Sequence, residues 1–315
     1  MIRLRELLAT AVFGVCTAAY GQEDLLSLVN DNKDEGPRKV YATFKTVKIC
    51  NAQTIETVKK NHLDFRIAHR FGNIYNSNVS NPINETFQTF FGFDNATDIR
   101  FSLDYGLLDN LTVGIGRSRF NKLVDGSLKW KILQQTSDFS VPISLAYFTT
   151  VGYTHAPTST MYSGVVKDFE TNELHRLNFF HELIIACKFN DYFSLEVLPS
   201  VLHRNFIKEN VNKNNDAKDA NTFFSVGFGG RIKMTKRVSF IGDYYYTFSP
   251  FYQNNENFFN PLALGFEIET GGHVFSLFFT NASGLIENNY LPYTTDSWAK
   301  GQVKFGFCIS RTFAL

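Results

Sequence analysis

The sequence predicts an all-β protein, a closed antiparallel transmembrane β-barrel of about 12 strands with short periplasmic turns and long extracellular loops. Three observations predict this fold. Apolar and polar residues alternate with period two, the connections alternate between short and long, and aromatic residues are frequent, with 33 Phe and 14 Tyr in 315 residues. Strands of this kind have one apolar and one polar face, which suits a sheet between lipid and a polar interior.

The N-terminus has the features of a secretory signal peptide. Two arginines precede an apolar run over residues 7–19, which is too short to span a bilayer, and residues 19–21 supply the small side chains that a signal peptidase needs. We therefore predict a signal peptide over residues 1–21. A lipoprotein signal at Cys16 is disfavoured, because the residues before it lack the small side chain expected beside a lipidated cysteine.

Composition excludes several classes of protein. Residues 1–21 contain Arg3, Arg5 and Glu6, so 29 basic and 29 acidic residues remain, and no basic excess points to nucleic acid. After residue 21 no apolar run approaches the length of a membrane-spanning helix. The remaining cysteines are odd in number and lack CxxC spacing, which predicts neither a disulfide scaffold nor a zinc site. We expect no metal and no cofactor.

Period-two alternation recurs from about residue 62 to the end of the chain and is the main sign of strands. Within residues 98–105, for example, Ile99, Phe101 and Leu103 share one face, and polar residues occupy the other. The predicted barrel spans residues 62–315. Twelve segments are predicted as strands: 62–71, 97–106, 111–119, 124–134, 140–153, 174–189, 192–204, 222–234, 238–248, 261–270, 273–281 and 301–313.

The connections between these segments predict the orientation of the barrel. Those after the second, fourth, sixth, eighth and tenth strands are tight, and those after the first, fifth, seventh, ninth and eleventh are long and polar. Only the gap after the third strand, Phe120–Leu123, breaks this alternation. Outer-membrane barrels have short periplasmic turns and long outer loops. An even strand number then returns both ends to the periplasm, and closure removes unpaired sheet edges.

Residues 22–61 do not follow the strand rhythm. Asp31–Pro37 is a charged linker, and Val40–Ile49 and Thr54–Val58 have only some strand character. An extra hairpin, a plug inserted into the barrel and a periplasmic extension are all compatible with this segment. We define it as an N-terminal periplasmic extension or plug segment.

Several stretches of the chain resemble a known family. They are HLDFRIAHRFGNI (62–74), FGFDNATDIRFSLDYGLLDNLTVGIGRS (91–118), GFEIETGGHVFSLFFTNASGL (265–285) and the closing GFCISRTF (306–313). These segments resemble a family of uncharacterised outer-membrane β-barrel proteins, a domain of unknown function, from Bacteroidetes-type bacteria. The resemblance runs from about Tyr41 to the end of the chain. It implies a barrel in the bacterial outer membrane but no particular activity, since a fold does not supply a function.

The polar face of each strand is expected to line the lumen. Seven acidic and five basic residues lie on these faces and are the candidate site: Asp64, Arg66, Arg100, Asp104, Lys129, Glu182, Glu196, Arg231, Asp243, Glu267, Glu269 and Lys304. The lumen of a barrel of about 12 strands is narrow, because diameter grows with strand number. The charges therefore form either a mutually neutralising network that closes the barrel or a narrow polar pore.

The leading functional hypothesis is a narrow channel or transporter for a small polar solute in the outer-membrane lipid. The alternative is a sealed barrel that binds a periplasmic or extracellular protein partner through its long loops or through residues 22–61. An outer-membrane lipid hydrolase is less favoured, because Ser and His are present without a GxSxG element or another ordered constellation. We predict no catalytic residue.

Histidines and glycines have structural interpretations. A metal site at His273 beside Glu267 and Glu269 is disfavoured, since no HxH or HExxH spacing is present. His181 shares the parity of lipid-facing residues, so either a bulge shifts the register or the ring lies near the membrane interface. Glycines 114, 116, 227, 229 and 230 lie in strand patterns without a following helix, which is typical of barrel curvature and not of nucleotide loops.

Aromatic residues are predicted in two settings. Those at strand ends are expected to form interfacial girdles: Tyr105, Trp130, Tyr147, Tyr192, Tyr244, Tyr245, Tyr246 and Phe313, with Tyr245 pointing inward. Those in loops could form a carbohydrate-binding platform or pack against one another: Phe251, Tyr252, Phe258, Phe259, Tyr290, Tyr293 and Trp298.

Overall fold

The computed structural model describes residues 38–164 and 170–315. The predicted signal peptide, over residues 1–21, and the charged linker lie outside the described residues, so both stay predictions.

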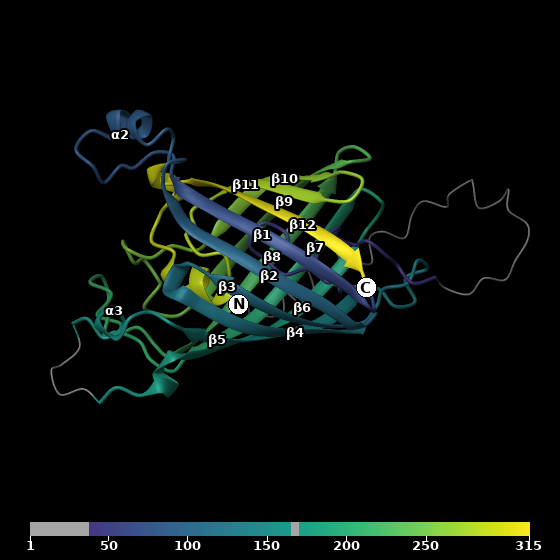
Figure 1. Cartoon of the computed structure of the whole chain (residues 1–315), viewed down its shortest axis with the longest axis horizontal. Coiled ribbons are helices and arrows are strands. Elements are labelled where there is room, and N and C mark those ends of the chain that lie inside the picture. Colours follow the sequence, from purple (N-terminus) through teal and green to yellow (C-terminus); the bar gives the residue numbers. More distant parts are fainter. Residues whose placement is uncertain (1–37, 165–169) are drawn as a thin grey trace, which may run out of the picture.

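Twelve antiparallel strands form one closed barrel in which each strand pairs with its neighbours in sequence, and the last pairs with the first (Figure 1). The predicted fold is therefore confirmed. The closing pair runs from His62 opposite Ala314 to Asn73 opposite Lys304. The strands are β1 (His62–Asn73), β2 (Ala96–Leu108), β3 (Leu111–Ser118), β4 (Leu123–Leu133), β5 (Ser144–Thr154), β6 (Leu177–Lys188), β7 (Phe193–Arg204), β8 (Thr222–Lys233), β9 (Val238–Phe248), β10 (Leu262–Glu269), β11 (Val274–Thr280) and β12 (Lys304–Ala314).

Helices are short and lie in the connections. Among residues 38–164 and 170–315, three are α-helical: α2 (Pro82–Gln88), α3 (Thr158–Met161) and α4 (Glu287–Tyr293). The same residues contain three 3₁₀ turns: η2 (Phe120–Lys122), η3 (Glu173–Arg176) and η4 (Trp298–Lys300). Within the described residues, none of the helices combines the length and the apolar character needed to cross a bilayer.

The two ends of the barrel differ in their connections. At one end, which we call the turn rim, short connections join the strands, and His62 and the C-terminal residue Leu315 lie there together, with Leu315 N–H donating to Asn61 O. At the other end, the loop rim, five of the six connections are long. The exception is η2 between β3 and β4, where Asn121 and Lys122 adopt left-handed φ values of 55° and 47° to make a tight corner. This corner corresponds to the short gap Phe120–Leu123, which interrupts the predicted alternation of short and long connections.

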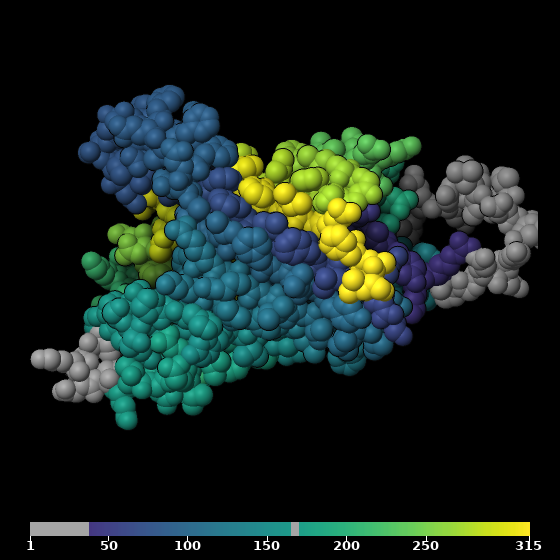
Figure 2. Space-filling model, viewed as in Figure 1, coloured from purple at the N-terminus to yellow at the C-terminus, as the bar shows by residue number. Residues whose placement is uncertain are grey.

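Strand parity separates an outer from an inner face. In β1, Asp64, Arg66, Ala68 and Arg70 are buried, while the residues that alternate with them are partly exposed. The outer face is mostly apolar, as expected for contact with acyl chains. Its most exposed residues include Phe101, Leu103, Ile115, Trp130, Ile132, Val151, Leu183, Phe224, Phe228, Phe266 and Phe279. Figure 2 shows the outside of the barrel from one side, coloured by position in the sequence.

The outward position of His181 needs no bulge. The pairing of β6 with β5 and with β7 keeps one register on both sides of this residue, so its ring stays on the outer face. There His181 Nδ1 lies 2.7 Å from the Tyr147 hydroxyl and 3.0 Å from the Thr149 hydroxyl. A polar ring on the lipid side is tolerated because neighbouring side chains satisfy it.

Three strands begin three or four residues later than the sequence indicates. β12 begins at Lys304 and not at residue 301, because Gly301 ends the 3₁₀ turn η4 with a left-handed φ of 72°. β5 begins at Ser144 and not at residue 140, because Pro142 has no N–H for the ladder and Thr136 N–H donates to Val141 O in a turn. β6 begins at Leu177 and not at residue 174, because Asn172 caps the 3₁₀ turn η3 through its side chain.

Aromatic side chains lie near both rims. Trp130 and Tyr192 are exposed toward the turn rim, and Tyr244 and Tyr246 are partly exposed on the outer face of β9. Tyr245 between them is fully buried inside the barrel, as its parity indicates. This arrangement fits interfacial girdles.

Candidate functional site in the barrel lumen

The lumen is filled by protein. Two segments enter it: residues 43–58, which we call the plug, and residues 281–303 between β11 and β12, which we call the inner loop. The chain reaches the plug from the turn rim, where Val40 N–H donates to Gln135 O. The inner loop folds back from the loop rim, so the two segments approach each other from opposite ends.

The inner face of the barrel is only partly polar. On β6 and β7 the inward residues include Phe180, Ile184, Leu198 and Leu202, which are fully buried. The expectation that the inner face of each strand is polar is wrong for these strands. The physical reason is the plug, whose apolar side chains belong to the same buried cluster and need apolar neighbours. These plug residues are Phe44, Ile49, Ala52 and Ile55.

Lys129 on β4 holds one side of the plug. Its ammonium donates to the Val47 carbonyl at 2.7 Å, the Thr54 carbonyl at 2.9 Å and the Glu56 carbonyl at 3.3 Å. An ammonium has three N–H donors, so this geometry uses all of them on backbone oxygens of the plug. The side chain is buried and also lies 5.6 Å from the centre of the Phe148 ring.

Asp243 on β9 holds the plug from another strand. Its carboxylate accepts from the Asn51 backbone N–H at 2.7 Å, the Asn51 side-chain amide at 2.9 Å and the Ala52 N–H at 3.2 Å. Lys129 binds plug carbonyls and Asp243 binds plug amides, so the two wall charges match the two polarities of its backbone. Charge-assisted hydrogen bonds of this kind are stronger than neutral ones.

The inner loop is bound to the wall by polar contacts as well. Arg70 donates to the Ala282 carbonyl at 2.8 Å, and the Asp98 carboxylate accepts from Leu285 N–H at 3.0 Å. Thr150 on β5 donates to the Asn288 side-chain oxygen at 2.8 Å. Contacts to β1, β2 and β5 therefore fix the loop across the lumen.

The plug and the inner loop meet each other at a buried ion pair. The Lys48 ammonium lies 2.9 Å from the Glu287 carboxylate, whose side chain is fully buried, and also donates to Leu285 O at 3.0 Å. The Tyr290 hydroxyl donates to Asn51 O at 3.3 Å. Together these contacts join the two segments into one closure.

Several wall charges pair with each other or with the inner loop. Two of them also contact the plug, since Glu267 accepts from the Thr46 hydroxyl at 3.3 Å and Glu269 lies 2.7 Å from the Lys45 ammonium. Arg100 and Asp125 form a two-pronged pair at 2.6 and 2.8 Å, and Arg66 lies 3.4 Å from Asp64. Arg231 pairs with Glu267 at 3.3 Å and Glu269 at 3.5 Å, and Lys304 pairs with Asp296 of the inner loop. The remaining predicted residues have fewer partners. The Tyr245 hydroxyl donates to Glu182 at 3.0 Å, and neither oxygen of buried Glu196 has a hydrogen-bond partner within the described residues.

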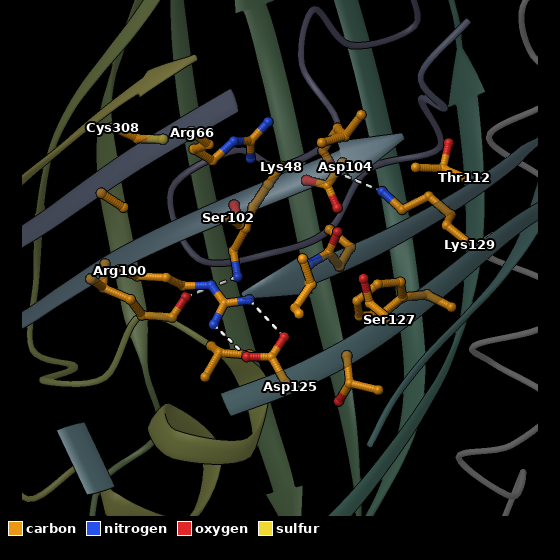
Figure 3. Close-up of a pocket in the computed structure, with 18 of the residues that line it drawn as sticks. Lys48, Arg66, Arg100, Ser102, Asp104, Thr112, Asp125, Ser127, Lys129 and Cys308 are labelled. Atoms are coloured by element: carbon orange, nitrogen blue, oxygen red, sulfur yellow. Dashed lines mark hydrogen bonds and ion pairs between the residues drawn. The ribbon is translucent and has the colours of Figure 1, made fainter. Parts of the chain in front are cut away.

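A small polar cavity remains between the plug and the wall of β1 to β4 (Figure 3). Its volume is about 50 Å³, and Arg66, Arg100, Asp104, Asp125 and Lys129 line it. Figure 3 shows the Arg100 guanidinium facing the Asp125 carboxylate across this space. A cavity of this size holds a few water molecules but no organic solute.

Larger hollows lie on either side of the closure. The loop rim has a pocket of about 300 Å³ lined by Arg204, Lys208, Asn289 and Tyr293 among others, and the turn rim has one of about 840 Å³ beside Lys59 and neighbouring residues. The plug and inner loop lie between the two rims and so interrupt any path from one hollow to the other.

All twelve predicted lumen residues lie on the inner face, but sequence reasoning missed their principal partners. Arg70, Asp98 and Asp125 have the inward parity of strand residues and could have been found from alternation alone. Lys48 and Glu287 lie outside the strands, and no local pattern marks them as lumen residues.

Other candidate residues have structural surroundings. In the loops, Phe251, Tyr252 and Phe258 pack against one another with ring centres 5.0 to 5.8 Å apart, and Tyr290 is buried in the lumen. These residues therefore do not form an exposed platform. The described residues contain no group of three or more His, Cys, Asp or Glu side chains placed to hold a metal ion. His203 near the loop rim lies 2.6 Å from the Thr222 hydroxyl.

Burial alters the acidity of plug groups. Burial raises the pKa of the Cys50 thiol well above its ordinary value, and the nearby Asp243 carboxylate adds to the effect. Burial also raises the pKa of the Tyr290 hydroxyl, with a further contribution from Glu287. Both groups stay protonated at neutral pH while the closure is in place.

A family model described as a membrane-bound β-barrel domain (DUF5777) matches residues 44–313. The chain belongs to this family. The match to the DUF5777 domain includes nearly all of the plug as well as the twelve strands, so the plug is part of the family's domain and not an appendage. The resemblance to an uncharacterised barrel family is thus confirmed, and the Bacteroidetes-type source stays a prediction.

Solved structures resemble this DUF5777 barrel in outline only. The NanC porin has a TM-score of 0.46 at 7% identity, with 80% of this chain and 100% of that chain covered. The KdgM porin in complex with disordered oligogalacturonate has a TM-score of 0.44 at 7% identity, covering 80% and 99%. LpxR from Salmonella typhimurium has a TM-score of 0.36 at 8% identity, covering 81% and 100%. A search of the curated proteins finds no match.

Proposed function

We propose that this protein is an outer-membrane passage for a small polar solute that is closed in the state described and opens when the plug leaves its position. The observation that supports this is the pair of wall charges that hold the plug. Lys129 and Asp243 bind backbone carbonyls and amides of residues 47–56, contacts that water can replace.

The wall itself supports the proposal. The Arg100 to Asp125 and Arg66 to Asp64 pairs lie within the barrel and do not use the plug. Withdrawal of the plug would leave these pairs intact and expose a polar path along β1 to β4. The acidic and basic groups on this path favour a small polar solute over an apolar one.

A second function is favoured by a different observation. The plug buries Phe44, Ile49 and Ile55 in the same apolar cluster as the inward residues of β6 and β7. Burial of this kind is typical of a permanent core, because exposing it to water costs free energy. A permanently sealed barrel that binds a protein partner through its outer loops is therefore the alternative.

The orientation of the barrel in the membrane and the removal of the signal peptide are part of the same proposal. The turn rim faces the periplasm, the loop rim faces outward, and the signal peptide over residues 1–21 is removed before insertion. Val40, where the chain approaches the plug, then lies on the periplasmic side, within reach of a factor that withdraws the plug.

The experiment is planar-bilayer conductance of three proteins: the full mature chain, a variant lacking residues 38–58, and Asp243→Asn, which keeps the side-chain shape but removes the charge that holds the plug. Heat-modifiable gel migration identifies which preparations contain a folded barrel. Leu174→Ala, an exposed change at the loop rim, is the control.

We expect no steady conductance from the full chain and from the control, brief openings from Asp243→Asn, and steady conductance from the deletion. A folded deletion variant that stays closed to ions would contradict the passage and favour the sealed barrel. If the deletion variant fails to fold, the conductance of Asp243→Asn alone decides. A conductance of Asp243→Asn that equals that of the full chain would contradict a plug held by polar contacts.

A further inference from the structure

The connection between β1 and β2 exposes a cluster of apolar side chains at the loop rim. We call residues 82–93, which include α2, the aromatic loop. Its exposed fractions are high for apolar residues: Ile83 67%, Phe87 67%, Phe90 64%, Phe91 40% and Phe93 43%. α2 buries no residue at all against the rest of the protein. Contiguous apolar exposure of this kind marks a site of interaction.

The aromatic loop is continuous with the membrane-facing wall. The Phe93 ring lies 4.8 Å from the Phe71 ring of β1 and 5.6 Å from the Phe305 ring of β12, both on the outer face. Phe305 in turn lies 5.7 Å from Phe279 of β11. On the other side, Phe90 lies 6.0 Å from Phe93. One unbroken series of rings therefore runs from the lipid-facing strands to the tip of the loop.

The C-terminal end of the aromatic loop is held against the end of β1. Gly72 N–H of β1 donates to Gly92 O at 3.0 Å, and a Cβ at Gly92 would lie 2.6 Å from Gly72 O, so the loop returns in direct contact with the strand end. Phe90, Phe91 and Gly92 all have left-handed φ values, of 46°, 58° and 80°. Bulky residues adopt this region only where the surroundings require it. Here it directs two phenylalanines into solvent-exposed positions.

The charge of the connection is low. Residues 74–95 contain two acidic residues, Glu85 and Asp94, and no lysine or arginine. Attraction to phosphate groups therefore does not explain the exposed rings. Figure 2 shows the connection standing out from the barrel beside the loop rim, at the level where the wall ends. This is where the boundary of a bilayer would lie if the wall spans it.

We propose that the aromatic loop is a membrane anchor, whose phenylalanines insert among the acyl chains of the leaflet next to the loop rim. The occupant of this surface is lipid, because the ring series is continuous with the face that already contacts lipid. Interfacial segments with aromatic side chains and a short helix bind bilayers by burying their apolar face just below the headgroups. The anchor would fix the depth and tilt of the barrel in the membrane.

The test uses tryptophan as a depth reporter in the full mature chain, reconstituted into nanodiscs with one barrel per disc. Phe87→Trp places the reporter on the aromatic loop, and Leu174→Trp places it at an exposed site on η3, away from the ring series. Each emission spectrum is taken as the difference from the parent protein, which contains Trp130 and Trp298. Discs are made with phosphatidylcholine that is either unmodified or brominated on the acyl chains close to the headgroup.

We expect brominated lipid to quench roughly half of the Phe87→Trp emission, as for a side chain at the acyl boundary, and to leave Leu174→Trp nearly unchanged. Iodide in the buffer should quench Leu174→Trp more strongly than Phe87→Trp. Equal quenching of both reporters by iodide, with none by brominated lipid, would overturn the anchor. Protection of Phe87→Trp only in discs with two barrels would also overturn it, since the occupant would then be a second copy of the chain.

A second variant keeps the test independent of the tryptophan substitution. Phe87→Ser together with Phe90→Ser should leave heat-modifiable migration unchanged and should lower quenching of a Phe93→Trp reporter by at least about twofold. Unchanged quenching of that reporter would mean that the wall alone places it near lipid, and the anchor would be rejected.

Discussion

The Lys48 ammonium and the Glu287 carboxylate form a buried ion pair, 2.9 Å apart, at the point where the plug meets the inner loop. The two residues are separated by almost the whole barrel in sequence and belong to segments that enter the lumen from opposite rims. Because the Glu287 side chain is fully buried and the Lys48 side chain is mostly buried, the closure depends on both segments being present. Loss of one partner would leave the other charge unpaired in the lumen.

The first prediction concerns this pair. Lys48→Met should weaken the closure by about 3 kcal/mol, because it strands the Glu287 carboxylate, and Lys48→Met with Glu287→Gln should cost less than the two single changes added together. Hydrogen exchange of the plug amides measures the opening free energy. Lys218→Met, which removes the exposed Lys218 to Glu209 pair, is the control and should leave plug exchange unchanged. Strictly additive single changes would contradict a direct coupling.

The second prediction compares two lysines on one face of β4. Lys129→Met removes a donor from three plug carbonyls and should destabilise the plug by about 1 to 3 kcal/mol. Lys131→Met removes only a long contact of 3.8 Å to Glu56 and should cost little. Protection of residues 47–56 from hydrogen exchange distinguishes the two. Equal losses of protection in Lys129→Met and Lys131→Met would indicate a general effect of removing a positive charge and not the loss of specific hydrogen bonds.

The third prediction uses Cys50 as a reporter of plug position. Its buried thiol has a raised pKa, so the thiol stays protonated and reacts slowly with maleimide between about pH 7 and 9 while the plug is in place. Release of the plug returns the thiol toward its ordinary pKa of about 8.5, so labelling should then rise with pH across that window.

The measurement for Cys50 is maleimide labelling followed by mass spectrometry of peptides. Cys187 is buried on β6 beside Gln135 and Pro142, away from the plug, and is the internal control that should stay unlabelled in every folded variant. Cys308 lines the cavity beside the plug, so its labelling should rise together with that of Cys50 when the plug is released. The folded full chain should show slow labelling at Cys50, and Lys129→Met should show faster labelling. Rapid labelling of Cys50 in the full chain at pH 7 would show that the plug is not held in the lumen.

The fourth prediction concerns Gly106, which contacts the chain where the plug ends and β1 follows. At Gly106 of β2 an added Cβ would lie 2.0 Å from the Lys59 carbonyl, and Gly106 O accepts from Asn61 N–H at 2.9 Å. Gly106→Ala should therefore displace residues 58–61, where the plug ends and the chain continues into β1, at a cost of about 1 to 3 kcal/mol. The matched change is Gly126→Ala on β4, where nothing lies within 4 Å of the added atom, and it should be neutral or slightly stabilising. Thermal unfolding in detergent compares the two, and an equal effect would contradict the contact.

Much of the fold could be predicted because its signals are local. The alternation around Phe101 and Leu103 requires only neighbours in sequence, and both side chains are exposed on the outer wall. Strand starts were less predictable. The start of β5 depends on the turn at Thr136 and Pro142, and the start of β6 depends on the cap at Asn172, which are details of hydrogen bonding.

The lumen was predicted in part. Parity correctly indicated the buried position of Tyr245 and the inward position of Lys129 and Asp243. It could not indicate what those charges bind, because their partners are backbone groups of the plug, more than 70 residues away for Lys129 and 190 for Asp243. It also missed the inward apolar residues Phe180 and Ile184, since a barrel interior is polar only where water or polar groups fill it.

The sequence by itself determined the number, order and faces of the strands, since a period of two is a property of each strand alone. It also determined which charges point inward. Only the tertiary structure decided that the lumen is closed. Closure depends on Lys48 meeting Glu287 and on plug carbonyls meeting Lys129, and such contacts between distant segments leave no periodic signal in the chain. The free energy of those contacts, and not the pattern of the strands, decides whether the barrel is open.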